Sequence, residues 1–294
     1  MRIPARLTLA FLSLLLAAGS PAVADEPVLV YTVNYPLAYF AQRFGGDSVR
    51  VVFPAPTDVD PAFWQPDPDT IRTYQTADIV LLNGAEYAKW VSSASLPRRR
   101  LVDTSRAFSV SIVETGAGVV HSHGPGGESH GHTGTAFTLW LDPTLAMAQT
   151  AAIESALTRA RPSSATAFES GRVALDADLA ALDGSFQRAF ASLGDEPLLA
   201  SHPVYQYLQR RYDLTIDALL WEPDVTPDED DWRDLDALAD AGGARWMLWE
   251  DEPTAATRSG LAERGIGVVV VRPLGNRPGD GDYLDGMRAN VAAI

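Results

Sequence analysis

The sequence predicts an α/β fold of two halves, each a mainly parallel sheet flanked by helices, joined by a long helical connector. In both halves, β-rich apolar runs alternate with segments of helical spacing, which is typical of strand–helix–strand units in parallel sheets. Between the halves lies an Ala-, Leu- and Arg-rich stretch whose apolar residues recur three and four positions apart. The chain has 294 residues, of which 46% are hydrophobic, so a core can form in both halves.

The first half is expected to contain three strands and two helices. The strands are residues 28–33, 49–53 and 78–82, and the helices are residues 37–44 and 68–75. Gly45-Gly46 ends the first helix, and Pro54 closes the second strand. Because parallel sheets bind ligands beyond the carboxyl ends of their strands, we expect binding near three segments. These segments are residues 34–36, 54–64 and 83–90.

The connector is expected to form two consecutive helices between Pro143 and Arg188, because Pro162 interrupts the helical spacing. In the second half, the expected strands are residues 198–202, 246–249 and 267–271, and the expected helices are residues 205–212, 228–241 and 283–294. His202 stands at the carboxyl end of one strand, and Glu250 directly follows another. Both are therefore candidates for a binding site at the edge of the second sheet.

Residues 1–24 have the pattern of a signal peptide. Arg2 and Arg6 precede a short apolar run, and Ala22-Val-Ala24 is a cleavage site, so the mature chain is expected to begin at Asp25. The apolar run is too short to span a membrane, and no cysteine follows it that could carry a lipid. The sequence therefore predicts an exported periplasmic protein without a membrane anchor.

Charge and cysteine content narrow the range of partners. The formal net charge is −15, and Lys89 is the only lysine, which argues against nucleic acid or anionic membranes as partners. The chain has no cysteine, so any metal must be held by histidine, aspartate, glutamate or water.

The segment 121–132 holds four of the five histidines of the chain. They are His121, His123, His130 and His132. Neutral imidazole is a common ligand of zinc, copper and nickel, and the intervening glycines leave the backbone free to fold around an ion. A solvated low-complexity loop is the alternative interpretation. We expect a flexible loop that collects metal ions.

Several short motifs, in this order along the chain, resemble one protein family. They are Tyr35-Pro-Leu37, Gly45-Gly-Asp47, Asp60-Pro-Ala-Phe-Trp-Gln-Pro66, Asp78-Ile-Val-Leu-Leu-Asn-Gly84, Trp140-Leu-Asp-Pro143, Ser201-His202 with Tyr205 and Tyr207, Pro273-Leu-Gly275, and Tyr283 with Met287, Arg288 and Asn290. Together they resemble the zinc- and manganese-binding proteins of bacterial ABC importers, the cluster A-I solute-binding proteins. The resemblance spans essentially the whole mature chain.

The resemblance implies two α/β lobes joined by a long backbone helix, with a metal in the cleft between them. It implies an amino-terminal lobe at 25–143, a helical connector at 144–190 and a carboxyl-terminal lobe at 191–294. The protein is then expected to be a monomer that captures a divalent metal and delivers it to the permease of an ABC importer.

The chain departs from the ligand set that the family usually uses, which is three histidines and one carboxylate. Ala62 and Thr138 stand where the first two histidines are expected, and His202 matches the third. The carboxylate falls at Asp280 or Asp282, because Gly281 occupies the nominal position. A normal three-histidine site is therefore absent.

Three ways of completing the site remain open. The favoured one is that histidines of segment 121–132 fold into the cleft and replace the missing ligands, to which acidic residues at strand ends can be added: Glu222, Glu250 or Glu252. In the second, Phe63, Trp64, Trp140 and Trp221 line a more apolar cleft that holds a metal chelate. In the third, the cleft is empty and segment 121–132 alone buffers metal.

The choice of metal follows from the ligand types. An imidazole-rich site without thiolates suits zinc, and then copper or nickel, whereas His202 with carboxylates alone favours manganese or iron(II). The main functional hypothesis is a periplasmic zinc receptor of an ABC importer. The alternatives are a receptor for a metal chelate and a periplasmic metal buffer or chaperone.

Enzymatic activity is not expected. A secreted metallohydrolase needs an open coordination position and a general base beside the metal. The sequence contains no H-E-x-x-H motif, and His202 is followed by Pro203, which favours a ligand at a strand end over a helical pair.

Overall fold

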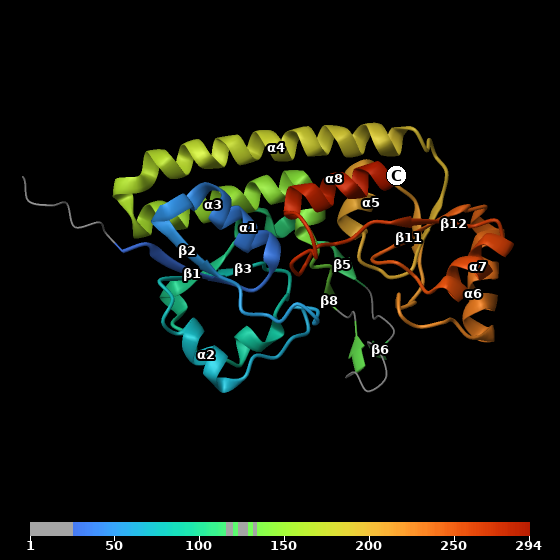
Figure 1. Ribbon diagram of the computed structural model, residues 1–294, viewed down its shortest axis with the longest axis horizontal. Coiled ribbons are helices and arrows are strands. Elements are labelled where there is room, and N and C mark those ends of the chain that lie inside the picture. The colour runs from blue at the N-terminus through green and yellow to red at the C-terminus, as the bar shows by residue number, and fades with distance from the viewer. Residues whose placement is uncertain (1–25, 116–119, 123–128, 132–133) are drawn as a thin grey trace, which may run out of the picture.

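The computed structural model describes residues 26–115, 120–122, 129–131 and 134–294. The expected signal peptide, His123 and His132 lie outside this range. Figure 1 shows a sheet toward each end of an elongated molecule, and helix α4 (Ala165–Ala191) runs alongside both. The predicted α/β fold with two parallel sheets and a long backbone helix is confirmed.

The first sheet has the strand order β2-β1-β3-β4, and all its pairs are parallel. Its strands are β1 (Val28–Thr32), β2 (Val49–Val52), β3 (Ile79–Leu82) and β4 (Leu101–Asp103), and its helices are α1 (Tyr35–Gly45) and α2 (Pro68–Tyr74). Asn34 ends the loop after β1 and caps α1, because its side chain accepts a hydrogen bond from the Leu37 N–H. Strand β4 was not predicted, since its three residues are too few to show a pattern.

The second sheet repeats this arrangement with the order β10-β9-β11-β12, again all parallel. Its strands are β9 (Leu198–Ala200), β10 (Ile216–Ala218), β11 (Trp246–Trp249) and β12 (Gly267–Val270), and its helices are α5 (Gln206–Tyr212), α6 (Glu229–Gly242), α7 (Ala255–Glu263) and α8 (Tyr283–Ala293). The strand predicted at 198–202 stops at Ala200, so His202 lies in the loop beyond it. Helix α7 was not predicted, because only Thr257 and Leu261 of its residues are buried.

The connector forms two helices, as predicted. Helix α3 (Pro143–Ala160) and helix α4 are separated by a short 3₁₀ turn, Pro162–Ser164. The residues of α4 that are buried follow helical spacing along its whole length; they are Phe168, Leu175, Leu179, Leu182, Asp183, Phe186 and Phe190. Helix α4 packs against α1 of the first sheet and α5 of the second, so it ties the two sheets together.

The chain returns to the first sheet after β12. The Tyr35 N–H donates to the Gly275 carbonyl at 2.9 Å, and the Asn276 amide donates to the Val59 carbonyl at 2.8 Å. Helix α8 then packs against α1 and α4, and the Tyr283 hydroxyl donates to the Trp140 carbonyl at 2.8 Å. The segment predicted to end the second lobe therefore also bridges to the first.

Two small antiparallel ribbons lie in the region of segment 121–132. They pair β5 (Glu114–Thr115) with β8 (Gly134–Thr135), and β6 (Val120–Ser122) with β7 (Ser129–Gly131). In the second ribbon the backbone of His121 lies opposite that of His130. The backbone pairing therefore brings two of the four predicted collector histidines together.

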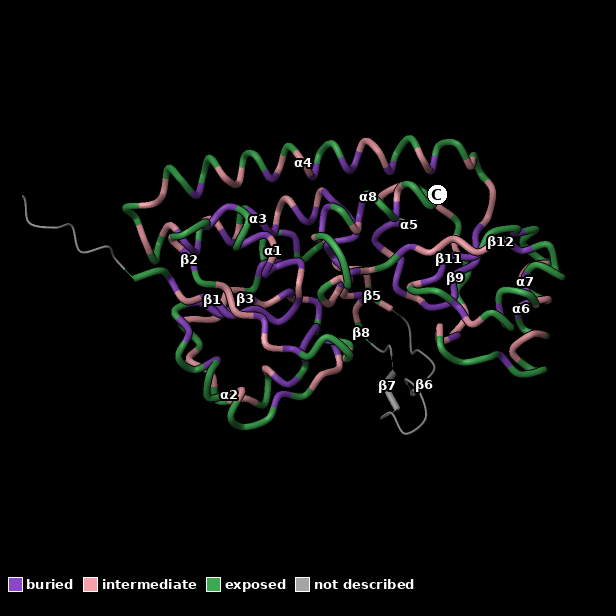
Figure 2. The backbone as a smooth tube through the Cα atoms, viewed as in Figure 1, coloured by how far each residue is buried: buried purple, intermediate pink, exposed green. Residues whose placement is uncertain are grey.

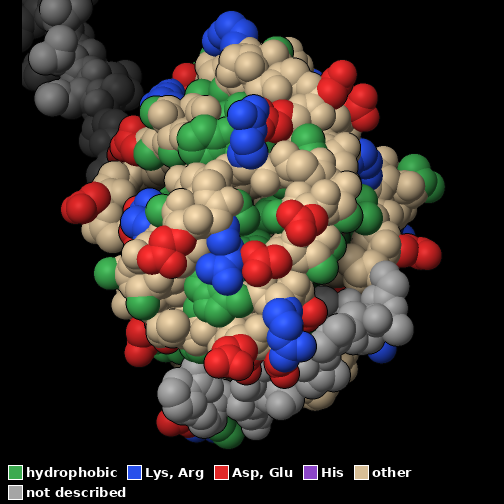
Figure 3. Space-filling view, turned by 90° about the vertical axis from the view of Figure 1, so that its right-hand side faces the viewer, with side chains coloured by type: hydrophobic (Ala, Val, Ile, Leu, Met, Phe, Trp, Pro, Cys, Tyr) green, Lys and Arg blue, Asp and Glu red, His purple; other side chains and the backbone are tan. Residues whose placement is uncertain are grey.

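The burial pattern follows the layers of the fold. In Figure 2 the two central strands of each sheet and the inner faces of α1, α3 and α4 are mostly buried, whereas the outer strands are partly exposed and α6 and α7 expose one side. The end of the molecule formed by the second sheet carries interspersed acidic and basic side chains (Figure 3). The second lobe contains the ion pairs Arg264–Asp236 and Arg258–Glu252. Within the described residues, no helix is both long and apolar enough to cross a membrane.

Candidate metal centre

Three potential metal ligands meet at the carboxyl edge of the second sheet. His202 follows β9, Glu222 follows β10 and Glu250 directly follows β11. Strand β9 lies between β10 and β11, so the three loops leave the sheet side by side. Parallel strands place their carboxyl ends at one edge, which is where such sheets bind ligands.

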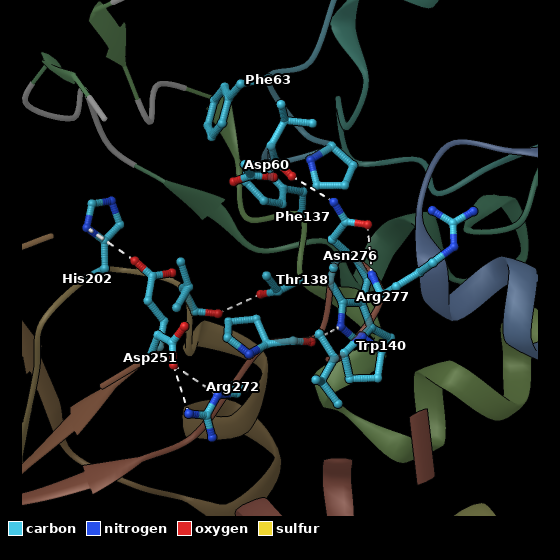
Figure 4. A pocket seen from close by; sticks show the side chains of 18 of the residues that line it. Asp60, Phe63, Phe137, Thr138, Trp140, His202, Asp251, Arg272, Asn276 and Arg277 are labelled. Carbon is cyan, nitrogen blue, oxygen red and sulfur yellow. Dashed lines mark hydrogen bonds and ion pairs between the residues drawn. The ribbon is translucent and has the colours of Figure 1, made fainter. Parts of the chain in front are cut away.

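The donor atoms of these side chains lie close together. His202, Glu222 and Glu250 each offer one atom, and the three atoms lie within 4.8 Å of one another. The His202 Nδ1 lies 3.9 Å from the Glu222 Oε1 and 4.0 Å from the Glu250 Oε1, a contact drawn in Figure 4. Two atoms that both lie about 2.0–2.2 Å from one zinc ion are at most about 4.4 Å apart. Both separations from the imidazole nitrogen therefore allow a shared ion.

The centre is largely withdrawn from solvent. The His202 side chain is 2% exposed, that of Glu222 12% and that of Glu250 22%. Two carboxylates in such a site create a negative potential that water screens poorly, and they favour a bound cation. Burial, and then the nearby charge of Glu250, raise the pKa of the Tyr205 hydroxyl well above its ordinary value.

The centre opens into a cavity of about 300 Å³ between the two lobes. Figure 4 shows Asp60, Phe63 and Phe137 of the first lobe on one side, and His202 and Asp251 of the second on another. The segment after β12 closes the remaining side; it contributes Arg272, Pro273, Leu274, Gly275, Asn276, Arg277, Pro278 and Gly279. The cavity can therefore hold a ligand in contact with both lobes.

The first lobe provides no imidazole at the two positions where the resemblance expects one. Ala62 is buried, and its N–H donates to the Asp60 Oδ1 at 2.8 Å. Thr138 is buried as well, and its hydroxyl donates to the Val204 carbonyl at 2.6 Å. The Thr138 hydroxyl thus links a segment of the first lobe to the loop that carries His202.

The two carboxylates predicted near the carboxyl terminus lie elsewhere. Asp282 caps helix α8, where its side chain accepts from the Asp285 N–H at 3.0 Å, and it also accepts from the Tyr39 hydroxyl. Asp280 is exposed. Neither residue lines the cavity or belongs to the described group of His202, Glu222 and Glu250.

Only part of the predicted aromatic lining is observed. Phe63 and Trp140 line the cavity, and Phe63 packs edge-on against Phe137 with ring centroids 6.0 Å apart. Trp64 does not line the cavity and packs against the cluster that holds Phe53. Trp221 belongs to the core of the second lobe, where its ring lies 5.0 Å from that of Trp232. The cavity therefore combines a polar end at His202 with an aromatic wall from the first lobe.

Two arginines also line the cavity. Arg272 donates to the Asp251 Oδ1 through its Nε at 3.0 Å and its Nη2 at 2.8 Å. Arg277 donates to the Phe53 and Ala55 carbonyls, and its guanidinium lies 4.5 Å from the centroid of the Phe53 ring. Burial lowers the pKa of Arg277 from its ordinary value, but an arginine stays protonated.

Comparison with known proteins places the chain in one family. It matches the family described as "Zinc-uptake complex component A periplasmic", or ZnuA, over residues 30–294. It is similar to the high-affinity zinc uptake system protein ZnuA of Bacillus subtilis (strain 168), with 24% identity over 285 residues that cover 94% of this chain and 89% of the relative.

Solved structures show the same fold. One is the metal-dependent lipoprotein YcdH of Bacillus subtilis, with a TM-score of 0.78 and 22% identity, covering 90% of this chain and 97% of that one. Another is the Zn(II)-bound ZnuA-like domain of AdcA from Streptococcus pneumoniae, with a TM-score of 0.76 and 19% identity, covering 91% and 97%. Both structural similarities cover the two lobes of this chain.

Proposed function

The chain belongs to the periplasmic zinc-uptake component A family, and from that premise we propose that it captures zinc in the periplasm and delivers it to the permease of an ABC importer. The observation that carries the proposal is the group of His202, Glu222 and Glu250 at the edge of the interlobe cavity. It acts as a binding protein and not as an enzyme.

Zinc is the cargo that the family indicates, whereas the described donor set taken alone would favour manganese or iron(II). One imidazole and two carboxylates bind several divalent ions, including manganese, copper and nickel. At a given site the affinity order of these ions places zinc above manganese and below copper. Selection against copper then depends on which metals are available in the periplasm.

The histidines of segment 121–132 form a second, weaker set of sites in this proposal. His121, His123, His130 and His132 collect ions at the surface, and the interlobe group holds the ion that is delivered. The division rests on the described group at the cavity, whose donor atoms come from the second lobe, while the side chains of the segment lie outside the described part of the chain.

Deletion of residues 122–131 tests this division. The deletion removes His123 and His130, so we expect the number of zinc ions bound in a calorimetric titration to fall, while the tight site keeps its affinity. The intact mature protein, without residues 1–24, is the control. Loss of the tight site in the deletion variant contradicts the division, because it means that the segment supplies ligands to the cavity.

Zinc affinity is expected to fall as the solution becomes more acidic. The imidazole and both carboxylates must be deprotonated to bind the ion, so protons compete with zinc. The decline is expected between about pH 7.5 and pH 5.5, on either side of the ordinary imidazole pKa. Titrations at several pH values measure it, and a constant affinity over this range contradicts an imidazole ligand.

A further inference from the structure

Thr138 stands where the family resemblance expects an imidazole, and its side chain makes a contact that joins the two lobes. The side chain comes from the first lobe and is buried. Its hydroxyl donates to the Val204 carbonyl at 2.6 Å, a bond drawn in Figure 4. The Val204 N–H in turn donates to the His202 carbonyl at 2.9 Å. A short chain of contacts therefore leads from Thr138 to the loop that carries the imidazole.

A second contact between the lobes holds the helix that follows this loop. Tyr207 lies in the first turn of α5, and its side chain is buried. Its hydroxyl donates to the Ala136 carbonyl at 2.8 Å and accepts from the Val113 N–H at 3.2 Å. The helix also packs against the 3₁₀ turn Leu139–Leu141. All these partners belong to the first lobe, so the start of α5 is fixed to it.

Ion pairs fix the other end of α5. The Arg211 guanidinium donates to the two carboxylate oxygens of Asp183 at 2.9 and 2.6 Å, and Asp183 belongs to the backbone helix α4. The Arg210 guanidinium lies 3.8 Å from the carboxylate of Asp142, which caps helix α3. Helix α5 is therefore attached at both ends to elements outside the second sheet.

The two carboxylates of the metal centre are carried by the second sheet itself. Glu222 follows Trp221, whose N–H donates to the Ser201 carbonyl at 2.7 Å and whose ring is buried in the core of the second lobe. Glu250 directly follows β11, which lies inside the same sheet. His202 stands between two supports, since β9 precedes it and the loop bound to the first lobe follows it.

We propose that the Thr138 hydroxyl positions the His202 imidazole for the captured ion, with the Tyr207 hydroxyl holding the same loop. This inference rests on the proposed zinc centre. Thr138 is not a ligand in this role, because it acts through the Val204 carbonyl. The ring of Pro203 restricts the backbone between His202 and Val204, so a shift of Val204 is passed on to the imidazole. Groups that orient a metal-binding histidine control how firmly it holds the ion.

The test measures how fast zinc leaves the mature protein loaded with one equivalent of zinc, using an excess of a chelator that changes colour. Thr138→Val removes the hydroxyl and keeps the branched shape, whereas Thr138→Ser keeps the hydroxyl. Loss of this one hydrogen bond is expected to speed dissociation from Thr138→Val about threefold to tenfold, while Thr138→Ser stays within about twofold of the mature protein. Tyr207→Phe removes the second contact and is expected to speed dissociation as well.

Thr32→Val is the matched control. Thr32 is buried, and its hydroxyl donates to the Asn34 carbonyl at 3.1 Å, so this bond stays within the first lobe. Thr32 is not among the described residues that line the cavity. Its substitution removes a buried hydroxyl without touching the second lobe, so the rate of zinc dissociation is expected to stay unchanged.

A spectrum separates positioning from a general loss of stability. The visible absorption of the cobalt(II)-substituted protein depends on the geometry of its ligands. It is expected to change in Thr138→Val, to return to that of the mature protein in Thr138→Ser, and to stay unchanged in Thr32→Val.

Three results overturn the inference. If Thr138→Val and Tyr207→Phe both match the mature protein in rate and spectrum, the positioning role is wrong while a centre that is lost in His202→Ala stands. If Thr32→Val releases zinc as fast as Thr138→Val, the effect is a general loss of stability. If tight zinc binding survives His202→Ala, the proposed centre is wrong and the inference fails with it.

Discussion

Replacing His202 by alanine is expected to abolish tight zinc binding. His202 contributes the only imidazole among the described donor atoms at the cavity, and its Nδ1 lies within 4.0 Å of both carboxylates. Loss of residues that merely support metal ligands costs about 10–100-fold in affinity, so loss of a ligand should cost at least about 100-fold. Calorimetric titration of the mature protein with zinc measures this change.

The control for His202→Ala is Glu252→Gln, which removes a charge near Glu250 from an exposed side chain. Glu252 is paired with Arg258, and its side chain is 59% exposed. The Glu252→Gln substitution is therefore expected to leave the zinc affinity nearly unchanged. Circular dichroism of the metal-free variants checks that both proteins fold. A His202→Ala variant that folds and still binds zinc tightly contradicts the proposed centre.

Replacing Trp140 by alanine is expected to cause the largest loss of stability. Trp140 is 1% exposed and packs edge-on against Tyr87, with ring centroids 5.8 Å apart. Its indole N–H donates to the Pro273 carbonyl at 2.6 Å, and its own carbonyl accepts from Tyr283. Deleting a buried tryptophan side chain costs about 3–5 kcal/mol, and here a hydrogen bond between the lobes is lost as well.

Equilibrium unfolding in urea measures the effect of Trp140→Ala, with Trp246→Ala as the control. Trp246 is 40% exposed, so its removal is expected to cost less than half as much free energy of unfolding as that of Trp140. Trp140 also lines the cavity, so the same side chain stabilises the fold and forms part of the cavity wall. An equal loss of unfolding free energy in the two variants contradicts the larger stabilising role of Trp140.

The fold could be predicted from the sequence where an element is long or strongly patterned. Strand β1 and helix α1 have clear apolar patterns, and Gly45-Gly46 marks the end of α1 in the sequence. Strand β4 and helix α7 have no such pattern, since tertiary contacts with neighbouring elements determine them.

The site could be predicted only in part. Glu222 and Glu250 were candidates because they follow strands, but their distance from His202 depends on β9 lying between β10 and β11, which no local pattern reveals. Asp282 was a candidate through the resemblance, and the sequence also contains a signal for the helix cap that it forms in the structure. Asp282 and Asp285 stand three residues apart directly before an apolar helix, in the arrangement of a capping box.

The central claim is that one zinc ion is shared by the three side chains of the second lobe. Anomalous diffraction at the zinc edge from crystals of the zinc-loaded protein tests it most directly. The predicted result is a peak about 2.0–2.2 Å from the His202 imidazole nitrogen and from carboxylate oxygens of Glu222 and Glu250. A peak confined to segment 121–132, with none at His202, contradicts the claim.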